Sequence, residues 1–391
     1  MNTNEKIRVL GKGLTAQAIK EKFPNALLYD DNDFKDYDLS SCEKTIVSPG
    51  IPPYNEMITK AKNVQSDYDL FDEVMPFSIW ISGTNGKTTT TQMCQHILNE
   101  RNSVCGGNIG TPLSKLDTNA SIWILETSSF TLHYTNTAKP NLYLLLPISE
   151  DHITWHGSFE EYENAKLKPL SLMKKGEIAI IPQCYKDYKS NAHKITYKDS
   201  DDLCEKFGID KSKIKFKEPF LLDALLALAS KKIIFDEIDY KKINTFTIDE
   251  HKVEEFIDNK NRVWVNDSKA TNVDATINAL VPYKDKNIHL ILGGDDKGAN
   301  LLPLFEVIKN LNVKVYAIGS NNKRVEKYCN EYNIEVENCE ILKNAVIKIN
   351  KNLKDNSIGI LSPSAASLDQ FKSYAQRGKT FKDLVLDLSK L

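Results

Sequence analysis

The sequence of 391 residues has no long hydrophobic run and no marked excess of either charge. Its longest apolar stretches, Asn141–Ile148 and Ala224–Ala229, are far shorter than the ~20 residues that a membrane-spanning helix requires. The 53 acidic side chains against 51 basic ones leave a net charge of −2. No general attraction to nucleic acid or to an anionic membrane follows from such a balance.

Clustered cysteines and an apolar leader are also missing. The seven cysteines are scattered and form no C-x-x-C pair, which argues against a disulfide framework and against a zinc cluster. Met1–Leu10 is polar and then strand-like, without the apolar core of a signal peptide. The sequence therefore predicts a cytoplasmic protein.

The chain instead alternates strand-like and helix-like segments. Apolar runs typical of buried strands occur at Ile7–Leu10, Ala26–Tyr29, Lys44–Val47, Phe77–Ile81, Ser121–Leu125, Asn141–Leu146, Glu177–Ile181, Val263–Asn266, His289–Leu292, Lys314–Ile318 and Ser357–Leu361. Helical patterns occur at Thr88–Glu100, Phe159–Met173, Asn272–Val281, Leu301–Asn310 and Ser367–Leu388. This alternation predicts an α/β fold in which helices cover parallel sheets.

Two linkers are predicted, around Tyr68–Pro76 and around Asn244–Glu250, and they would divide the chain into three domains. The length allows this division at roughly 100–200 residues per domain. The stretch from Cys184 to Phe220 is highly charged and weakly periodic, so we expect irregular structure there.

A phosphate-binding loop is indicated by SIWISGTNGKTTTT at Ser78–Thr91, where a strand, a glycine turn and a helix start follow one another. Lys87 would lie against the β- and γ-phosphates, and the Thr88 hydroxyl would bind Mg²⁺. Only two residues separate Gly83 from Gly86, whereas the general loop has four. A glycine turn with an ordinary surface lysine is the alternative, and the order of the elements argues against it.

A second glycine turn lies near the start of the chain, in IRVLGKGLTA at Ile7–Ala16, and Asp30 and Asp31 follow the next strand. The pattern is that of a dinucleotide-binding strand and helix, with Asp30 placed to meet a ribose hydroxyl. A turn that needs glycine only for close packing explains it equally well. A further turn at Ser48–Ile51, also after a strand, favours a nucleotide-type ligand.

Three polar residues of the middle region follow or accompany strand ends. Glu126 ends a strand and could hold Mg²⁺, and His152 follows another strand and should face the same crevice. Either could instead cap a helix or lie on the surface. Lys166 is on the helix after His152, and a helical lysine is ordinarily a solvated charge.

Three polar blocks follow strands in the last third, at Asn266–Asn272, Gly293–Gly298 and Leu361–Phe371. Loops at the carboxyl edge of a parallel sheet are where ligands bind. Turn and cap chemistry explains each block singly, but together their lysines and hydroxyls suit a small anionic ligand.

With these motifs the chain resembles the Mur ligase superfamily, the ATP-dependent amide-forming enzymes of peptidoglycan precursor synthesis. The G-T-N-G-K-T loop is specific for the superfamily and accounts for the short spacing between its glycines. The N-D-S-K-A-T-N and L-S-P-x-x-A-S-L-D-Q-F blocks are specific for its D-glutamate-adding branch. The resemblance covers nearly the whole chain and is weakest between Cys184 and Phe246.

The resemblance implies three α/β domains: a Rossmann-like domain over residues 1–73 for the UDP-linked substrate, a P-loop mononucleotide-binding domain over 74–249, and a Rossmann-like domain over 250–391 for the amino acid. It implies ATP-dependent addition of D-glutamate to UDP-N-acetylmuramoyl-L-alanine through an acyl phosphate. The implied cofactors are ATP, two magnesium ions and a carbamate on Lys166, which turns a cation into a carboxylate-like metal ligand. We expect a monomer that binds no nucleic acid and does not insert into membranes.

The residues that match the family motifs take the implied roles. The UDP-linked substrate would be bound by Leu14, Thr15, Asp30, Ser48, Gly50 and Asn108. ATP would be bound by Gly83, Thr84, Asn85, Gly86, Lys87, Thr88, Thr89, His251, Asn266, Asp267 and Lys269. D-glutamate would be bound by Thr271, Lys297, Ser367 and Tyr374. The catalytic residues would be Lys87, Glu126, His152 and Lys166, and the metal ligands Thr88, Glu126, His152 and carbamylated Lys166.

The chain departs from the family pattern near the adenine. Pro219, Phe220 and Asp223 stand where a histidine and asparagines are usual, and Lys252 stands where arginine is usual. Lysine cannot offer the bidentate fork of an arginine. Adenine recognition is therefore left open by the resemblance, whereas the phosphate and glutamate motifs are complete.

Other interpretations share part of this pattern. Another Mur branch or a folylpolyglutamate-type ligase would have the same phosphate loop, but Asn266–Asn272 and Ser362–Phe371 argue against both. A nucleotide-binding regulatory protein without ligation chemistry would not require Glu126, His152 and Lys166 together. An NAD-dependent oxidoreductase would use the first glycine turn and leave the phosphate loop without a role.

Overall fold

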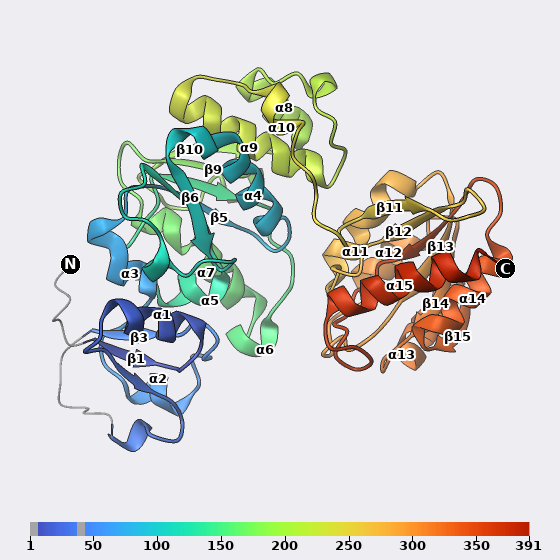
Figure 1. Ribbon diagram of the computed structural model, residues 1–391, viewed down its shortest axis with the longest axis horizontal. Helices are drawn as coiled ribbons and strands as arrows, with labels where there is room; N and C mark the ends of the chain where they lie inside the picture. Colours follow the sequence, from blue (N-terminus) through green and yellow to red (C-terminus); the bar gives the residue numbers. More distant parts are fainter. Residues whose placement is uncertain (1–6, 37–43, 391) are drawn as a thin grey trace. The chain divides into compact units, whose positions relative to one another are not determined.

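The computed structural model describes residues 7–36 and 44–390, and the chain divides into two compact units (Figure 1). Unit 1 comprises Met1–Phe216 and Phe220–Phe246, and unit 2 comprises Lys217–Pro219 and Thr247–Leu391. The change of unit at Phe246 falls inside the linker predicted at Asn244–Glu250. A separate domain over residues 1–73 stays a prediction. No helix in the described part of the chain is long and apolar enough to cross a bilayer.

Unit 1 begins with a four-stranded parallel sheet in the order β2-β1-β3-β4. The strands are β1 (Arg8–Leu10), β2 (Leu27–Tyr29), β3 (Thr45–Val47) and β4 (Val64–Gln65). The helices of this part are α1 (Leu14–Lys22), α2 (Glu56–Lys60) and α3 (Asp67–Phe71). All three residues of β1 are buried, as expected of a central parallel strand with helices on both faces.

Helix α3 shows that the linker predicted at Tyr68–Pro76 is wrong. Ser66 and Asp69 form a capping box at the start of the helix, and Tyr68 and Phe71 are buried in the core. Asp69 also accepts hydrogen bonds from the backbone N–H groups of residues 136–138 at 2.8–3.0 Å. The acidic composition suggested a solvated connection, but these carboxylates cap a helix and bind backbone amides.

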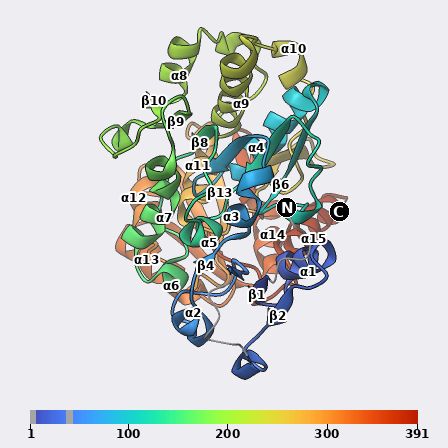
Figure 2. The same ribbon diagram turned by 90° about the vertical axis from the view of Figure 1, so that its left-hand side faces the viewer.

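The second sheet of unit 1 has six parallel strands in the order β10-β9-β8-β5-β7-β6. The strands are β5 (Phe77–Ser82), β6 (Ser103–Gly107), β7 (Ile122–Glu126), β8 (Leu142–Leu145), β9 (Ile178–Pro182) and β10 (His193–Tyr197). The helices are α4 (Lys87–Leu98), α5 (Ser129–Tyr134), α6 (Ile153–His156), α7 (Phe159–Leu172), α8 (Ser200–Phe207), α9 (Phe220–Phe235) and α10 (Tyr240–Ile243). In Figures 1 and 2, α8, α9 and α10 lie together at one end of unit 1, and the four-stranded sheet lies at the other.

The irregular structure expected between Cys184 and Phe220 is only partly confirmed: residues 186–192 and 214–219 are in neither helix nor strand, but β10 and α8 lie between them. Strand β10 pairs with β9 along its whole length, and α8 is capped by the Asp199 side chain. The charged residues there lie outside, while Tyr197 and Leu203 are buried. A few buried apolar side chains are enough to hold these elements, so overall charge was a poor guide.

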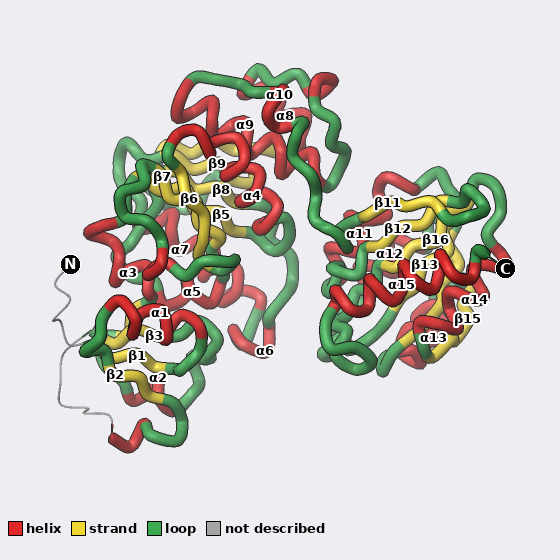
Figure 3. The backbone as a smooth tube through the Cα atoms, viewed as in Figure 1, coloured by secondary structure: helices red, strands yellow, loops and turns green. Residues whose placement is uncertain are grey.

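Unit 2 is one six-stranded sheet with helices on both faces, as Figure 3 shows. Its order is β11-β12-β16-β13-β14-β15, and only the edge strand β11 runs antiparallel. The strands are β11 (Glu254–Ile257), β12 (Val263–Asn266), β13 (Asn287–Leu292), β14 (Val313–Ile318), β15 (Glu335–Glu340) and β16 (Ser357–Leu361). The helices are α11 (Val273–Leu280), α12 (Leu302–Ile308), α13 (Asn322–Glu331), α14 (Leu342–Asn352) and α15 (Tyr374–Leu388).

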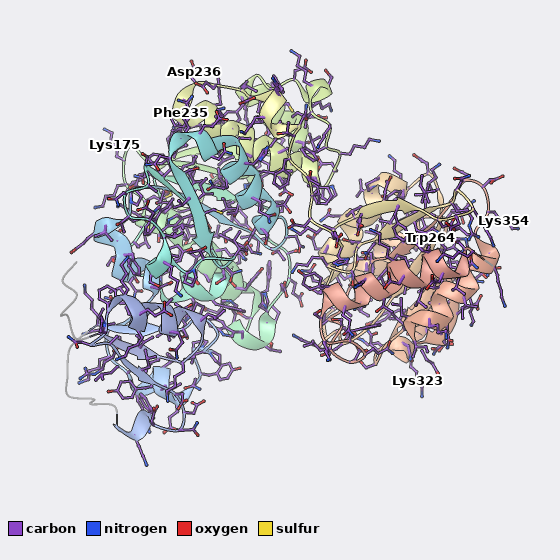
Figure 4. The ribbon with its side chains drawn as sticks, viewed as in Figure 1. Lys175, Phe235, Asp236, Trp264, Lys323 and Lys354 are labelled. Carbon is purple, nitrogen blue, oxygen red and sulfur yellow. The ribbon has the colours of Figure 1, made fainter. Side chains whose placement is uncertain are left out.

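Helix α15 packs on β12 of this sheet. The Trp264 side chain, labelled in Figure 4, is fully buried, and its ring contacts Phe381 of α15 at 5.9 Å between centroids. Gly359 on β16 leaves the space that the indole occupies, because a Cβ there would collide with it. The helix predicted from Ser367 begins only at Tyr374, where the Ser373 hydroxyl caps it.

Candidate active site

The loop between β5 and α4 has the backbone of a phosphate-binding loop. Gly83 and Gly86 adopt positive φ angles of 139° and 84°, and α4 begins at Lys87. A Cβ at Gly83 would collide with Leu146, so only glycine fits this turn. Backbone N–H groups at the start of α4 are the groups that bind phosphate at helix N-termini. Asn85 and Thr88 are half-buried in this segment, and Thr89 is buried.

Two lysines converge on the carbonyl oxygen of Gly83. The Lys87 Nζ donates to it at 3.0 Å and to the Thr84 carbonyl at 2.7 Å. The Lys166 Nζ, reaching from α7, donates to the same Gly83 oxygen at 2.6 Å. Lys166 is 1% exposed, so the expectation of a solvated lysine is wrong. Burial, and next the charge of Lys87, hold the pKa of Lys166 well below its usual range.

Glu126 joins two other predicted site residues. It is buried at the end of β7, and its Oε2 accepts a hydrogen bond from the Thr88 hydroxyl at 2.8 Å. Its Oε1 accepts one from the Asn108 Nδ2 at 2.6 Å. The structure therefore brings Thr88, Glu126 and Asn108 together, although they come from three segments of the chain.

His152 lies close to the same loop through Tyr162. Its backbone has a left-handed φ of 54°, and its ring contacts Tyr162 at 6.1 Å between centroids. Tyr162 also places its ring 4.6 Å from the Lys166 Nζ and its hydroxyl 3.0 Å from the Thr84 hydroxyl. Tyr162 was not among the predicted residues. Its spacing of four residues before Lys166 was the available signal, because such residues share a helix face.

The donor set suits magnesium bound together with phosphate. A carboxylate and a hydroxyl, Glu126 and Thr88, lie 2.8 Å apart at the phosphate loop. Within residues 7–36 and 44–390, no three His, Cys, Asp or Glu side chains form a group that could hold a metal. Mg²⁺ commonly binds through one or two carboxylates plus substrate phosphates and waters, which fits this partial site.

The turns after β1 and β3 pack on one another at the edge of the four-stranded sheet. Gly11 has a φ of 101°, and a Cβ there would lie 2.5 Å from the Ser48 Oγ. Close packing is thus a sufficient reason for this glycine, and its ligand role stays a prediction. Leu14 is 85% exposed at the start of α1, Thr15 beside it is half-buried, and Gly50 is exposed.

Asp30 follows β2 at the same edge of the sheet. Its Oδ1 accepts the Asn32 backbone N–H at 3.0 Å, and its Oδ2 lies 3.2 Å from the Lys12 Nζ. Lys12 also pairs with Asp33 at 2.6 Å, and this contact lowers the pKa of the Asp33 carboxyl. Lys12 was not among the predicted residues, and nothing in its sequence pattern distinguishes it from a surface lysine.

In unit 2 the three polar blocks meet. Arg377 on α15, which is 1% exposed, donates from Nη2 to the carbonyls of Ser268 at 2.9 Å and Ala365 at 3.0 Å. Asp295 and Ala366 form a backbone bridge with hydrogen bonds of 2.9 and 3.0 Å. Arg377 was not among the predicted residues, because its role depends on contacts with residues distant in the sequence.

The predicted nucleotide residues of unit 2 form one network. The Asn266 Nδ2 lies 2.8 Å from the His251 Nδ1. Asp267 accepts hydrogen bonds from the Ser362 hydroxyl at 2.7 Å and from the Val253 N–H at 3.1 Å. Burial raises the pKa of Asp267 to about 7 despite these bonds.

The predicted amino-acid residues lie on the three blocks and on α15. Lys269 places its Nζ 4.2 Å from the centre of the Tyr374 ring. Thr271 and Lys297 are exposed, and Ser367 is buried. The exposed cations and hydroxyls leave this region open to a small anion.

Three of the four departures near the adenine lie immediately before α9 or in its first turn, and the fourth, Lys252, pairs with Asp249 at 2.9 Å. Pro219 and Phe220 precede and begin the helix. Asp223 is buried and accepts a hydrogen bond from the Thr90 hydroxyl at 2.7 Å. A Cβ on Gly86 would lie 2.6 Å from the Asp223 Oδ1. Asp223 therefore lies against Gly86 of the phosphate loop and bonds to Thr90 of α4.

The comparisons with known proteins point to one family. The model of the Mur ligase middle domain matches residues 81–221. A UDP-N-acetylmuramoylalanine–D-glutamate ligase of Campylobacter jejuni is 51% identical over 97% of this chain and 99% of the relative. Its counterpart in Helicobacter pylori is 45% identical with the same coverage. The crystal structure of MurF ligase from Thermotoga maritima in complex with ADP matches at a TM-score of 0.59 and 14% identity, covering 100% of this chain and 97% of that one. This last match concerns the fold, and it confirms the predicted α/β class.

Proposed function

The chain belongs to the UDP-N-acetylmuramoylalanine–D-glutamate ligase family of the Mur ligases, and from this premise we propose how its residues act. The protein is an ATP-dependent, ADP-forming ligase of peptidoglycan synthesis that adds D-glutamate to UDP-N-acetylmuramoyl-L-alanine. The resemblance found in the sequence is thereby confirmed. The observation that carries the proposed roles is the group formed by Lys87, Lys166, Thr88 and Glu126 around one glycine loop.

The reaction must activate a carboxylate, whose negative charge makes it a poor electrophile. The carboxylate of the alanyl residue attacks the γ-phosphorus of ATP, which gives an acyl phosphate and ADP. The D-glutamate amine then attacks the carbonyl carbon, the amide bond forms, and the amine proton and inorganic phosphate leave. Acyl phosphates are hydrolysed by water, so a site that excludes water protects this intermediate.

Lys87 is proposed to neutralise the charge that develops on the transferred phosphoryl group. In the structure its ammonium is held by the Gly83 and Thr84 carbonyls, next to the loop that would receive the triphosphate. A cation fixed where charge develops contributes several kcal/mol of transition-state stabilisation. On binding, phosphate oxygens would take the place of these carbonyl oxygens.

Magnesium would be held by Glu126 and Thr88 together with phosphate oxygens, and it would supply charge neutralisation at the transferred phosphoryl group. The short contact between the Thr88 hydroxyl and the Glu126 carboxylate places both oxygens at the end of β7 and the start of α4. Two ions, with His152 as a further ligand, are the arrangement proposed. His152 could also accept the proton from the attacking amine, as could a bound phosphate oxygen.

Lys166 is proposed to carry a carbamate. The neutral amine attacks carbon dioxide, a carbon–nitrogen bond forms, and one proton is released to give a carboxylate on Nζ. Only an uncharged amine has the lone pair for this step. Burial and the nearby Lys87 favour that uncharged form by holding the pKa of Lys166 well below its usual range. The product would add an oxygen ligand beside Glu126.

The substrates are assigned to residues that follow strands in all three sheets. We propose that the UDP-linked substrate is bound through Leu14, Thr15, Asp30, Ser48, Gly50 and Asn108. The nucleotide is bound through Gly83–Thr89 and through His251, Asn266, Asp267 and Lys269. D-glutamate is bound through Thr271, Lys297, Ser367 and Tyr374. We propose a cytoplasmic location, which the scattered cysteines favour, and we propose a monomer.

The test is an assay of inorganic phosphate release by the purified protein with ATP and Mg²⁺. Release should require UDP-N-acetylmuramoyl-L-alanine and D-glutamate together, and the amide product should be found by mass spectrometry. Equal turnover with L-glutamate, or turnover with a folate in place of the UDP-linked acceptor, would contradict the assignment. Omitting magnesium should abolish phosphate release. A reaction that proceeds without metal would contradict the roles proposed for the metal ligands.

A further inference from the structure

A buried histidine and serine connect the two turns that carry Glu126 and His152. The His156 Nε2 lies 3.0 Å from the Ser129 hydroxyl, and the two residues are 7% and 3% exposed. Ser129 begins α5, three residues after Glu126. His156 ends the single turn of α6, four residues after His152. None of the roles assigned above uses this pair.

The His156 ring is fixed by aromatic neighbours. It stacks on Phe130 with 5.6 Å between centroids and an interplanar angle of 26°, and it meets the Tyr162 ring edge-on at 5.4 Å. Trp155 and His133 cover its other sides at 4.4 and 6.1 Å. Burial lowers the pKa of His156 to about 3. The ring is therefore a neutral imidazole, which can either accept from or donate to the serine hydroxyl.

We propose that His156 is a positioning residue: its hydrogen bond to Ser129 holds the turn bearing Glu126 at a fixed separation from the turn bearing His152. This inference rests on the proposed function, since it takes these two residues as magnesium ligands. Substituting a residue that orients a metal ligand commonly lowers metal affinity by ten- to a hundredfold.

The two turns lead into short helices, although the Ser128 hydroxyl caps the start of α5. Helix α6 has four residues and ends at Gly157, whose φ is 88°, and α5 has six residues. Helices this short are not stable by themselves. A hydrogen bond between buried partners supplies a directional constraint, and loss of one partner leaves the other unsatisfied in the core.

Packing by Trp155 is the competing explanation for this region. Trp155 belongs to a core cluster with Leu10, Tyr29, Val47 and Tyr134, so it joins α6 to the four-stranded sheet. If α6 only needs to be buried, a ring without nitrogen at position 156 would serve equally well. The two explanations therefore differ in whether the polar atoms matter.

The experiment measures Mn²⁺ affinity calorimetrically in the presence of a non-hydrolysable ATP analogue, together with thermal stability. His156→Phe keeps a ring and removes both nitrogens, and Ser129→Ala removes the hydroxyl. Each should weaken Mn²⁺ binding by about tenfold, and the double variant should be no weaker than either alone. His156→Gln, which can still bond to the hydroxyl, should stay within about threefold of the parent protein.

Ser114→Ala is the matched control, because the Ser114 hydroxyl is buried and has no hydrogen-bond partner among the described residues. It should leave Mn²⁺ affinity unchanged. Unchanged affinity in Ser129→Ala and His156→Phe, even with a lower melting temperature, would overturn the inference. If His156→Phe does not fold, Ser129→Ala decides. A parent protein whose ligation of D-glutamate is independent of metal would instead refute the proposed function.

Discussion

The candidate phosphate site of unit 1 and the candidate amino-acid site of unit 2 are built in opposite ways. In unit 1 two of the charged groups are buried, since Lys166 is 1% and Glu126 is 2% exposed, whereas Lys87 is half-buried and His152 is exposed. In unit 2 two groups assigned to the ligand, Thr271 and Lys297, are exposed, whereas Ser367 is buried. The buried Arg377 binds carbonyl oxygens of the ligand-bearing loops. Two charged groups of the first site are thus shielded from water, whereas two ligand-binding groups of the second site are accessible to it.

This contrast matches the work proposed for each site. Phosphoryl transfer benefits from charges in a low-dielectric environment, where electrostatic interactions are strong. Capture of a small, charged amino acid needs accessible side chains and a fixed loop geometry. Substitutions in unit 1 should therefore change the rate of chemistry, and substitutions in unit 2 should change the affinity for one substrate.

The largest expected effect is that of Lys87→Ala, because this cation faces the transferred phosphoryl group. Turnover should fall by about 10³-fold or more, measured as phosphate release at saturating substrates. Lys232→Ala is the control, since Lys232 pairs with Asp236 on the surface at 2.5 Å. Turnover within a few-fold of the parent protein in Lys87→Ala would show that the loop does not bind the triphosphate.

Lys166→Ala should lose about 10²-fold in turnover, and short carboxylates such as formate or acetate should restore part of it. The added carboxylate would take the place of the carbamate. Lys168→Ala is the matched control on the same helix, where Lys168 donates to the His133 carbonyl at 2.7 Å. If the loss in Lys166→Ala is not relieved by any carboxylate, the carbamate is contradicted, although a charge role remains.

Arg377→Lys tests the scaffold of unit 2. Lysine lacks the planar fork that reaches Ser268 and Ala365 together, so the KM for D-glutamate should rise about tenfold while the KM for the UDP-linked substrate changes little. Arg262→Lys is the control, because Arg262 pairs with Asp258 at 2.7 Å on another part of the sheet. An equal rise in both KM values would indicate general destabilisation instead.

The smallest expected effect on turnover is that of Asp67→Asn, whose effect should be on stability. Burial raises the pKa of Asp67 to about 7 from 3.8, so the folded state binds this proton more tightly than the unfolded state. The stabilisation that the protonated Asp67 carboxyl contributes is fully present below pH 4 and is lost as the pH rises to 7. The free energy of unfolding falls over this range by at most about 4 kcal/mol. The variant should flatten this dependence in calorimetric unfolding.

Asp267 is the counterpart of Asp67 in unit 2, with a pKa also raised to about 7 by burial. Asp267→Asn should flatten the same pH window in the unfolding of its own unit. Identical pH profiles in the parent protein and both variants would contradict the burial argument. Turnover is not the readout for Asp267, since this residue is assigned to the nucleotide.

The fold was predictable where strands are apolar and helices follow them. The runs at Phe77–Ile81 and Ser357–Leu361 are both central strands. Strands β6, β11 and β15 were not predicted, because glycines and acidic residues interrupt their apolar pattern. All three are edge strands, so each has a neighbouring strand on one side only.

The site was predictable only as far as motifs extend. The loop at Gly83–Thr89 and the three blocks of unit 2 lie at strand ends, as expected. Tyr162, His156 and Arg377 were missed, since each acts through contacts with residues distant in sequence. The burial of Lys166 was likewise invisible, because a lysine on a half-polar helix has no local feature that marks it as desolvated.

The Gly83 carbonyl has a consequence for how Lys166 could be modified. It accepts a hydrogen bond from the Lys166 Nζ at 2.6 Å. A carbamate nitrogen still bears one hydrogen, so that contact can persist after carbon dioxide has been added. The Gly83 carbonyl would then hold the Lys166 nitrogen in the same position before and after carbamate formation. The new carboxylate would be oriented without any refolding of α7.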